Sequence, residues 1–322
     1  MTSDKPLVLL VSDNIWALHA ERIRRIAPGV VPVIYEGDEP IDPSRLADVE
    51  VCFLSADTWP ERIRGISVSI MKSPSLAWLQ TFSAGVDSPF FVELMNRGVT
   101  LTNASGASST PIAHTVMLYI LALSRDVRSW NRKQDRREWD PQPLVEIEGS
   151  HLAVIGMGPI GLEIARLGAA FGMHVEAVRR TPTGSEPCAT FGFDALTDVL
   201  GRADWVALAL PLTDDTRHLF DANMIARIKP GARFINVGRG ELVDESALVD
   251  SLRSGHLAGA ALDVFEVEPL PVESPLWAMD NVIITPHNSG TTGSSGARSA
   301  EIFLDNLARY VAGDVLRNRV DH

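Results

Sequence analysis

Arg239, Glu268 and His287 are side chains of types that can bind an anion and transfer a proton, and each follows directly after a predicted strand. The planar fork of Arg239 can hold a carboxylate or the adjacent carbonyl oxygen. The imidazole of His287 can exchange a proton with a 2-hydroxy or 2-keto oxygen. A hydrogen bond to Glu268 would orient the imidazole and favour its protonated form. Taken singly, each residue could cap a helix or lie in a surface turn. Because all three follow directly after predicted strands, we expect one common site.

A glycine motif predicts the cofactor that this chemistry needs. The apolar run 151–155 leads into G-x-G-x-x-G, with glycines at Gly156, Gly158 and Gly161, and a helical pattern follows over 160–171. Gly156 permits the tight turn, Gly158 lets the backbone approach a pyrophosphate, and Gly161 lets the helix pack close to the strand. The helix N-terminus then offers N–H groups to the anion. Strand, motif and helix together predict a bound dinucleotide, and an ordinary turn is the alternative. A nicotinamide would supply or accept the hydride.

The end of the next predicted strand, 173–178, indicates which dinucleotide. An acidic residue that accepts from the ribose 2′-hydroxyl is expected about 20 residues after the motif. This chain has Arg179, Arg180 and Thr181 there instead. Two guanidinium groups and a hydroxyl pair well with a 2′-phosphate, so we expect NADP in preference to NAD. The alternative is that both arginines are simply solvated and NAD binds less selectively.

Alternating strands and helices must position these residues. The first third predicts strands at 7–11, 30–35, 49–54, 76–82 and 99–102, with helices at 15–26 and 59–70. After residue 150 it predicts strands at 151–155, 173–178, 205–210, 232–237, 258–264 and 282–285, with helices at 160–171, 194–202, 221–228 and 244–254. Such alternation predicts parallel sheets covered on both faces, which bind ligands at the carboxyl ends of their strands.

Three further segments complete the prediction. The small-residue loop 83–87 could offer backbone N–H groups to a carboxylate, or could be a plain turn. Helix 111–124 is apolar almost all round, which is typical of a core or a subunit interface. The polar stretch 125–148 reads as a connection, and a helix over about 297–311 is expected to cross back to the first domain.

Length and composition limit the possibilities. The 322 residues are too many for one typical core and predict two domains. A net charge of -12 argues against nucleic-acid binding and against an anionic membrane surface. Cys52 and Cys188 are the only cysteines and have no metal-ligand spacing, so we expect no metal and no disulfide framework. Neither a signal peptide nor a membrane-spanning stretch is recognisable, which predicts a cytoplasmic protein.

Taken together, the motifs resemble the D-isomer-specific 2-hydroxyacid dehydrogenase family over nearly the whole chain. The matching segments are 83–87 (SAGVD), 156–161 (GMGPIG), 210–212 (LPL), 236–243 (NVGRGELV), 263–269 (DVFEVEP) and 285–287 (TPH). The resemblance implies an α/β fold of two Rossmann-like domains with parallel sheets. It implies a discontinuous substrate domain, 1–103 and 288–322, around a contiguous dinucleotide-binding domain, 104–287. It also implies a homodimer.

The resemblance assigns a role to each candidate residue. It implies that Arg239, Glu268 and His287 are catalytic, with His287 as general acid and base. Ala84 and Gly85 would bind the substrate carboxylate through their amides, beside Arg239 and His287. The implied cofactor-binding residues are Gly156, Gly158, Pro159, Ile160, Gly161, Arg179, Arg180, Thr181, Leu210, Pro211, Gly238, Asp263, His287 and Ser289.

Two positions depart from the family pattern. His114 stands where the family commonly has Glu, and Asn288-Ser289 follows His287 where small apolar residues are more usual. Neither change removes a catalytic group. We therefore expect an NADPH-dependent reductase that converts a small 2-keto acid, first of all glyoxylate or hydroxypyruvate, to a D-2-hydroxy acid. The alternatives are a dinucleotide-sensing protein like the family's corepressors, and an NAD-dependent dehydrogenase of another 2-hydroxy acid such as phosphoglycerate.

Overall fold

The computed structural model describes residues 5–320, which form two compact units. Of these residues, unit 1 comprises 5–108 and 292–320, and unit 2 comprises 109–291. These boundaries lie a few residues beyond the expected 103/104 and 287/288. Ala104 donates its N–H to the Ser83 carbonyl and Ala107 accepts from Arg298, so this segment bonds within unit 1. Ser289 donates to Asp263, which keeps the residues after His287 in unit 2.

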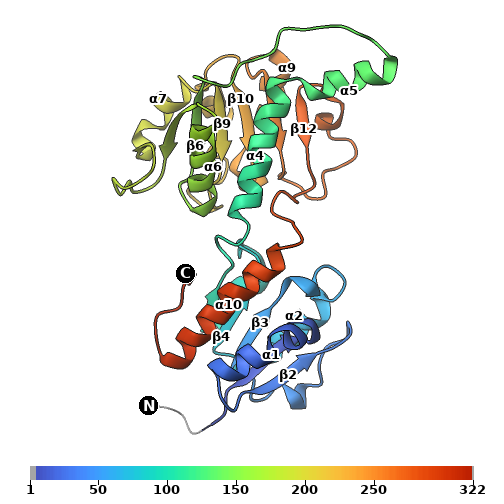
Figure 1. Cartoon of the computed structure of the whole chain (residues 1–322), viewed down its shortest axis with the longest axis vertical. Helices are drawn as coiled ribbons and strands as arrows, with labels where there is room; N and C mark the ends of the chain where they lie inside the picture. The colour runs from blue at the N-terminus through green and yellow to red at the C-terminus, as the bar shows by residue number, and fades with distance from the viewer. Residues whose placement is uncertain (1–4, 321–322) are drawn as a thin grey trace. The chain divides into compact units, whose positions relative to one another are not determined.

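Unit 1 is built on a parallel sheet in the order β2-β1-β3-β4-β5 (Figure 1). Its strands are β1 (Val8–Ser12), β2 (Val31–Tyr35), β3 (Val51–Leu54), β4 (Trp78–Thr81) and β5 (Thr100–Thr102). Its helices are α1 (Asp13–Ile26), α2 (Ile63–Met71), α3 (Pro89–Asn96) and α10 (Ser295–Ala312), with 3-10 turns η1 (Pro43–Arg45) and η2 (Ala56–Thr58).

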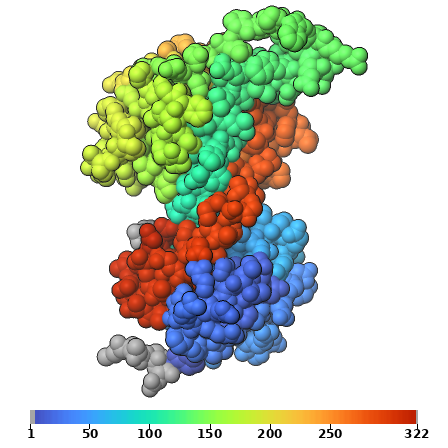
Figure 2. Space-filling model, in the orientation of Figure 1, coloured from blue at the N-terminus to red at the C-terminus, as the bar shows by residue number. Residues whose placement is uncertain are grey.

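Helices cover both faces of this sheet. α1 and α10 bury Ile23 and Phe303 against one face, where the Phe303 ring stacks on Phe53 with centroids 4.4 Å apart. α2 and α3 bury Ile66 and Leu94 against the other. Figure 2 shows α10, in red, beside α1, in blue. Both ends of the chain therefore contribute to one core.

Unit 2 is built on a longer parallel sheet in the order β12-β11-β10-β9-β6-β7-β8 (Figure 1). Its strands are β6 (His151–Ile155), β7 (His174–Val178), β8 (Ala189–Phe191), β9 (Trp205–Leu208), β10 (Arg233–Asn236), β11 (Gly259–Leu262) and β12 (Val282–Ile284). Its helices are α4 (Ser109–Ser124), α5 (Val127–Arg136), α6 (Pro159–Ala170), α7 (Leu196–Leu200), α8 (Ala222–Ile225) and α9 (Glu245–Ser254). The 3-10 turns are η3 (Phe193–Ala195), η4 (Gly240–Leu242) and η5 (Pro275–Ala278).

The strand order of unit 2 determines where a ligand can bind. α4 and α6 lie side by side on one face, and α7, α8 and α9 cover the other. From β6 the chain moves outward through β7 and β8, then returns to β9 on the opposite side of β6. Crevices for ligands open at the carboxyl ends of strands where the order reverses in this way. The expected α/β fold with two parallel sheets is confirmed.

Some predicted elements were wrong or missing. The predicted helix 59–70 begins only at Ile63, because Pro60 drives the preceding Trp59 into an extended conformation. The stretch 125–148 is not only a connection: it contains α5, which the Asp126 side chain caps through the Ser129 N–H. The short α3 and β8 were not predicted. Among residues 5–320, no helix combines the length and apolar character needed to cross a membrane.

Candidate active site

His287 and Glu268 form the central pair of the site in unit 2. The Nδ1 of His287 lies 2.8 Å from Oε2 of Glu268, and the side chains are 47% and 36% exposed. This pairing leaves Nε2 of the imidazole as the ring nitrogen available to a substrate. His287 has a φ of 50°, a conformation uncommon outside glycine and one that clusters at functional sites. The backbone of His287 is held there by its N–H, which donates to the Asp263 carbonyl.

The buried carboxylate of Asp263 organises the loop that carries His287. Asp263 is 1% exposed and accepts hydrogen bonds from Thr285 Oγ1 at 2.5 Å and from the N–H groups of Asn288 and Ser289 at 3.0 and 3.1 Å. The Ser289 hydroxyl also donates to it. Asp263 and Ser289, both expected at the cofactor, thus form a structural contact that spans the ends of β11 and β12.

The Arg239 loop is tied to both neighbouring strand ends. Asn236 accepts from the Gly238 N–H at 3.0 Å and donates to the Arg239 carbonyl at 2.8 Å. A Cβ at Gly238 would lie 2.8 Å from the Leu210 carbonyl oxygen, and one at Gly240 would lie 1.9 Å from the Phe265 backbone. These glycines let the loops after β9, β10 and β11 pack in contact. Arg239, Leu210 and the Phe265–Glu268 segment are therefore brought together at one edge of the sheet.

The glycine motif has the geometry that a dinucleotide requires. Gly156 has a φ of 107°, and a Cβ there would lie 2.5 Å from the Ala209 carbonyl oxygen. A Cβ at Gly161 would lie 1.8 Å from the Gly156 oxygen, so the α6 backbone approaches β6 as closely as expected. By contrast, a Cβ at Gly158 would meet nothing within 4 Å, and no side chain caps α6. Gly158 and Pro159 thus border open space at a helix N-terminus, which fits a pyrophosphate.

The arginines after β7 both lie beside carboxylates. Nη1 of Arg179 lies 2.8 Å from Oε1 of Glu186, whose side chain is only 3% exposed. Nη2 of Arg180 lies 3.7 Å from Oδ2 of Asp215 in the loop after β9, and these side chains are 75% and 87% exposed. The sequence predicted the arginines but neither of their partners. Thr181 is exposed next to them.

The loop expected to bind a carboxylate lies in unit 1, directly after β4. Asn103 donates to the Ala84 carbonyl at 2.7 Å, and the Ser83 hydroxyl donates to the Gly85 carbonyl at 2.8 Å. Both carbonyls are thus held by side chains of their own unit. No described residue accepts a hydrogen bond from the N–H of Ala84 or Gly85, and Ala84 is exposed. Two neighbouring backbone donors suit an anionic oxygen.

Several residues at the site were not predicted to belong to it. The Tyr119 hydroxyl of α4 bonds to Thr285, and burial raises the pKa of this tyrosine to about 12. Nε2 of His218 lies 2.5 Å from Oε1 of Glu266, two residues before Glu268. A carboxylate of α9, Glu245, accepts from the Glu266 N–H at 3.3 Å. Tertiary packing places these residues at the site, and no spacing in the sequence indicates that they belong to it. The departure at His114 lies on an exposed part of α4.

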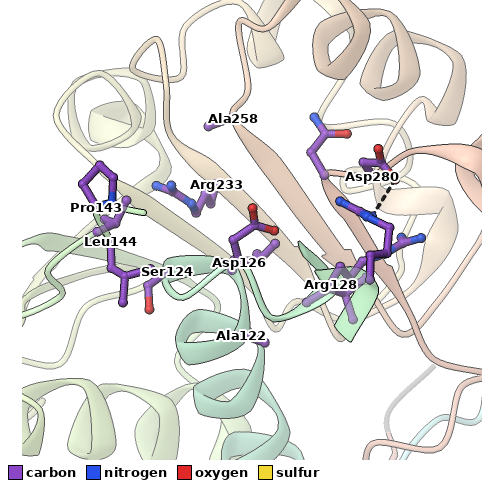
Figure 3. A pocket seen from close by; sticks show the side chains of 14 residues that line it. Ala122, Ser124, Asp126, Arg128, Pro143, Leu144, Arg233, Ala258 and Asp280 are labelled. Carbon is purple, nitrogen blue, oxygen red and sulfur yellow. Dashed lines mark hydrogen bonds and ion pairs between the residues drawn. The ribbon is translucent and has the colours of Figure 1, made fainter. Parts of the chain in front are cut away.

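A pocket of about 280 Å³ opens elsewhere, at the amino-terminal edge of the same sheet (Figure 3). Arg233, at the start of β10, lines it together with Arg128, Arg132 and Asp280. Arg132 lies 2.7 Å from Asp280, and Arg128 donates to two backbone carbonyls. None of the predicted site residues lines this pocket.

The geometry of unit 2 agrees with what comparison with known proteins shows. Residues 117–289 match the model of the D-isomer specific 2-hydroxyacid dehydrogenase NAD-binding domain. The chain therefore belongs to the D-isomer specific 2-hydroxyacid dehydrogenase family, a family of NAD(P)-dependent oxidoreductases.

Within this family, the chain is similar to several named relatives. The chain is 38% identical over 259 residues to a glyoxylate/hydroxypyruvate reductase B of Escherichia fergusonii, which covers 78% of this chain and 79% of the relative. It resembles a crystal structure of a Xanthobacter autotrophicus family member in complex with NADPH, with a TM-score of 0.79, 31% identity and 98% of each chain covered. It also resembles an NADPH-dependent glyoxylate/hydroxypyruvate reductase of Sinorhizobium meliloti, with a TM-score of 0.78, 28% identity and 98% of each chain covered.

Proposed function

We propose that this protein reduces a small 2-keto acid, with glyoxylate and hydroxypyruvate as the first candidates, to the D-2-hydroxy acid, with NADPH as cofactor. The observation that carries the proposal is the 2.8 Å contact between His287 Nδ1 and Glu268 Oε2, at the sheet edge that also holds Arg239. The names of the relatives in Escherichia fergusonii and Sinorhizobium meliloti support the choice of substrates.

Arg239 is proposed to bind and orient the keto acid. Its guanidinium can bond in parallel to the carboxylate and the neighbouring keto oxygen, which fixes the plane of the substrate. The contact of Gly240 with the Phe265 backbone ties the Arg239 loop to the segment that leads to Glu268. Arg239 and the acid-base pair are therefore held as one unit before a substrate arrives.

His287 is proposed to exchange the proton. As an imidazolium it donates from Nδ1 to Glu268 and from Nε2 to the keto oxygen, which becomes the hydroxyl of the product. In the opposite direction neutral His287 keeps its proton on Nδ1, which donates to Glu268, and accepts the hydroxyl proton of the substrate at Nε2. Glu268 fixes the tautomer and stabilises the charged ring, in the role of the acid in a catalytic triad. When bound, the nicotinamide supplies the hydride.

The cofactor is proposed to bind along the carboxyl ends of β6, β7 and β9. Gly156, Gly158, Pro159, Ile160 and Gly161 would hold the pyrophosphate. Arg179, Arg180 and Thr181 would bind the 2′-phosphate, and Leu210, Pro211, Gly238, Asp263 and Ser289 would line the remainder. The structures crystallised with NADPH and NADP support this preference. In unit 1, the Ala84 and Gly85 amides are proposed to bind the substrate carboxylate.

A substrate panel tests the proposal. NADPH and NADH oxidation would be followed by absorbance with glyoxylate, hydroxypyruvate, pyruvate, phenylpyruvate and a branched keto acid. We expect turnover with NADPH on one or two of the smallest acids, and slower turnover with NADH. Tight cofactor binding with no turnover on any acid would contradict a reductase and favour a dinucleotide-sensing role.

We further propose that the protein is a cytoplasmic homodimer. α4 is apolar around most of its circumference, and Leu118 on this helix is 61% exposed. Trp130 on α5 and Trp139 after it are 47% and 97% exposed. Such side chains on neighbouring segments suit a subunit interface. Light scattering on the purified chain is expected to give twice the monomer mass, and a monomer mass at micromolar concentration would contradict the dimer.

A further inference from the structure

Glu186 lies at the centre of the turn that follows Arg179 and Arg180. Its carboxylate accepts hydrogen bonds from the Thr183 N–H, the Thr183 hydroxyl and the Gly184 N–H, all at 2.8 Å. A fourth bond, also at 2.8 Å, comes from Nη1 of Arg179. The Thr183 and Arg179 donors lower the pKa of Glu186 to about 2, so the group is ionised at neutral pH. One nearly buried carboxylate thus connects the start of the β7–β8 loop to its tip.

This contact orients Arg179 without using all of its donors. A guanidinium has five N–H donors in a fixed plane. Within the described part of the chain, the Arg179 side chain donates one hydrogen bond, from Nη1 to Glu186. The Nε edge and Nη2 therefore keep their capacity to bind a phosphate, while the rotation of the long side chain is restricted in advance.

Arg180 differs from Arg179 in this respect. Its contact with Asp215 is 3.7 Å long and both side chains are largely exposed, so it contributes little and exchanges readily. Of the two arginines, only Arg179 is held by a protected partner. The side chain that can be positioned before a ligand arrives is therefore the one bound to Glu186.

We propose that Glu186 is a positioning residue that shapes the subsite for the 2′-phosphate of NADP and so sets the preference over NAD. The inference rests on the proposed function, in which Arg179, Arg180 and Thr181 bind this phosphate. It goes beyond that function because it gives a carboxylate, which by charge alone repels a phosphate, a favourable role. Glu186 acts by fixing Arg179 and by folding the turn over 181–186.

A purely repulsive role and a positioning role predict opposite changes in the affinity of a Glu186 variant for 2′-phosphorylated nucleotides. If Glu186 were only a negative charge near the phosphate, removing it would tighten binding of 2′-phosphorylated nucleotides. If it positions Arg179 and the turn, removing it makes the ligand order both on binding, and binding weakens. The carboxylate is already surrounded by four donors, which reduces its repulsion of a neighbouring anion. We expect the ordering cost to dominate.

Calorimetric binding of two nucleotide fragments to the full chain tests this inference without turnover. Adenosine 2′,5′-bisphosphate carries the 2′-phosphate, and adenosine 5′-monophosphate does not. Glu186→Gln, which keeps the shape, and Glu186→Ala are expected to weaken the bisphosphate about 3- to 10-fold and the monophosphate less than about 2-fold. Thr183→Val, which removes one hydroxyl donor to Glu186, is expected to act in the same direction by a smaller factor.

Glu176→Gln is the matched control. Glu176 lies on β7 and makes an ion pair of 2.6 Å with Arg202 away from the loop, so its loss is expected to leave the ratio of the two affinities unchanged. Tighter bisphosphate binding by the Glu186 variants, equal losses for both fragments, or an unchanged ratio would overturn the role of Glu186. Equal binding of both fragments by the unaltered chain would remove the NADP preference itself, together with this inference.

Discussion

The two ends of β10 place an arginine at each edge of the unit 2 sheet, with opposite consequences. Arg233, at the amino-terminal edge, lies with its guanidinium carbon 4.9 Å from the centre of the Trp205 ring and lines a pocket of about 280 Å³. Burial lowers its pKa. Arg239, at the carboxyl edge, lies in a loop held by Asn236 and by two glycine contacts, and the His287–Glu268 pair follows strands of the same edge.

The difference shows that cavity volume alone does not identify a site. At the amino-terminal edge, the guanidinium groups contact backbone carbonyls, an aspartate and an aromatic face, all of which stabilise the fold. At the carboxyl edge, backbone groups and the buried Asp263 carboxylate hold the loop that carries His287. A candidate site is better identified by the hydrogen bonds that hold its loops and by the strand ends that meet there.

The largest effect is expected from the acid-base group itself. His287→Ala should lower turnover by roughly 10²–10⁴-fold, because proton transfer to the keto oxygen loses its donor. Cofactor affinity, measured by fluorescence titration, should remain within about 2-fold because the proposed pyrophosphate contacts lie on β6 and α6. Unchanged turnover would show that another group supplies the proton.

A matched pair of arginine variants compares the two edges directly. Arg239→Met should lower kcat/KM by about 10²-fold or more, since the substrate loses a charge-paired contact. Arg233→Met should leave kcat/KM unchanged within about 2-fold, and should lower Tm by about 2–4 °C through the lost cation–π contact. Steady-state kinetics and thermal unfolding on the same samples would separate these results. A large loss of kcat/KM in Arg233→Met would contradict the assignment of function to the carboxyl edge alone.

Charge reversal at the end of β7 is expected to affect one cofactor more than the other. Arg179→Asp should weaken NADPH by about 10- to 100-fold, because a charged hydrogen bond is replaced by repulsion. NADH should be affected far less. Binding titrations with both cofactors provide the measurement. Equal losses for the two would mean that the phosphate is held elsewhere.

The smallest effect is expected at the exposed partner of Arg180. Asp215→Asn removes the carboxylate beside Arg180, which we propose binds the 2′-phosphate, and should tighten NADPH by about 2- to 5-fold, the size typical of an exposed ion pair. Its neighbour Asp214 is exposed in the same loop, and Asp214→Asn is the control. A gain of the same size in both variants, or in NADH binding, would indicate a general charge effect. The gain should shrink in high salt.

The parts of this fold that the sequence predicts well are those with strong local patterns. The strands of both sheets other than β8, and the glycine motif, are recognisable because apolar runs and glycines directly reflect the backbone conformation. α5 was missed because its ten residues have no apolar stripe and are stabilised by the Asp126 cap and by charge. β8 has only three residues, and its pairing with β7 is a tertiary contact.

The site shows the same limit. Arg239, Glu268 and His287 were predicted as one candidate site because each follows a strand, and parallel strands bring such ends to one edge. The partners Glu186, Asp215, Tyr119 and His218 belong to loops or helices whose approach depends on tertiary packing. No spacing in the sequence predicts that Glu186 folds back onto Arg179. The sequence predicts candidate reacting groups, and tertiary packing determines which residues support them.

The discontinuous construction of unit 1 has a consequence for biosynthesis. α10 supplies Phe303, Leu304 and Leu307 to the face of the sheet that includes Leu9 and Phe53, yet the whole of unit 2 lies between residue 108 and this helix. At about 5–20 residues per second, a ribosome needs roughly 10–40 s to make the intervening chain. During that time α1 alone covers this face of the nascent sheet, and the part that α10 covers in the finished fold stays open. Unit 2, which is contiguous, can complete its core first, and unit 1 closes last.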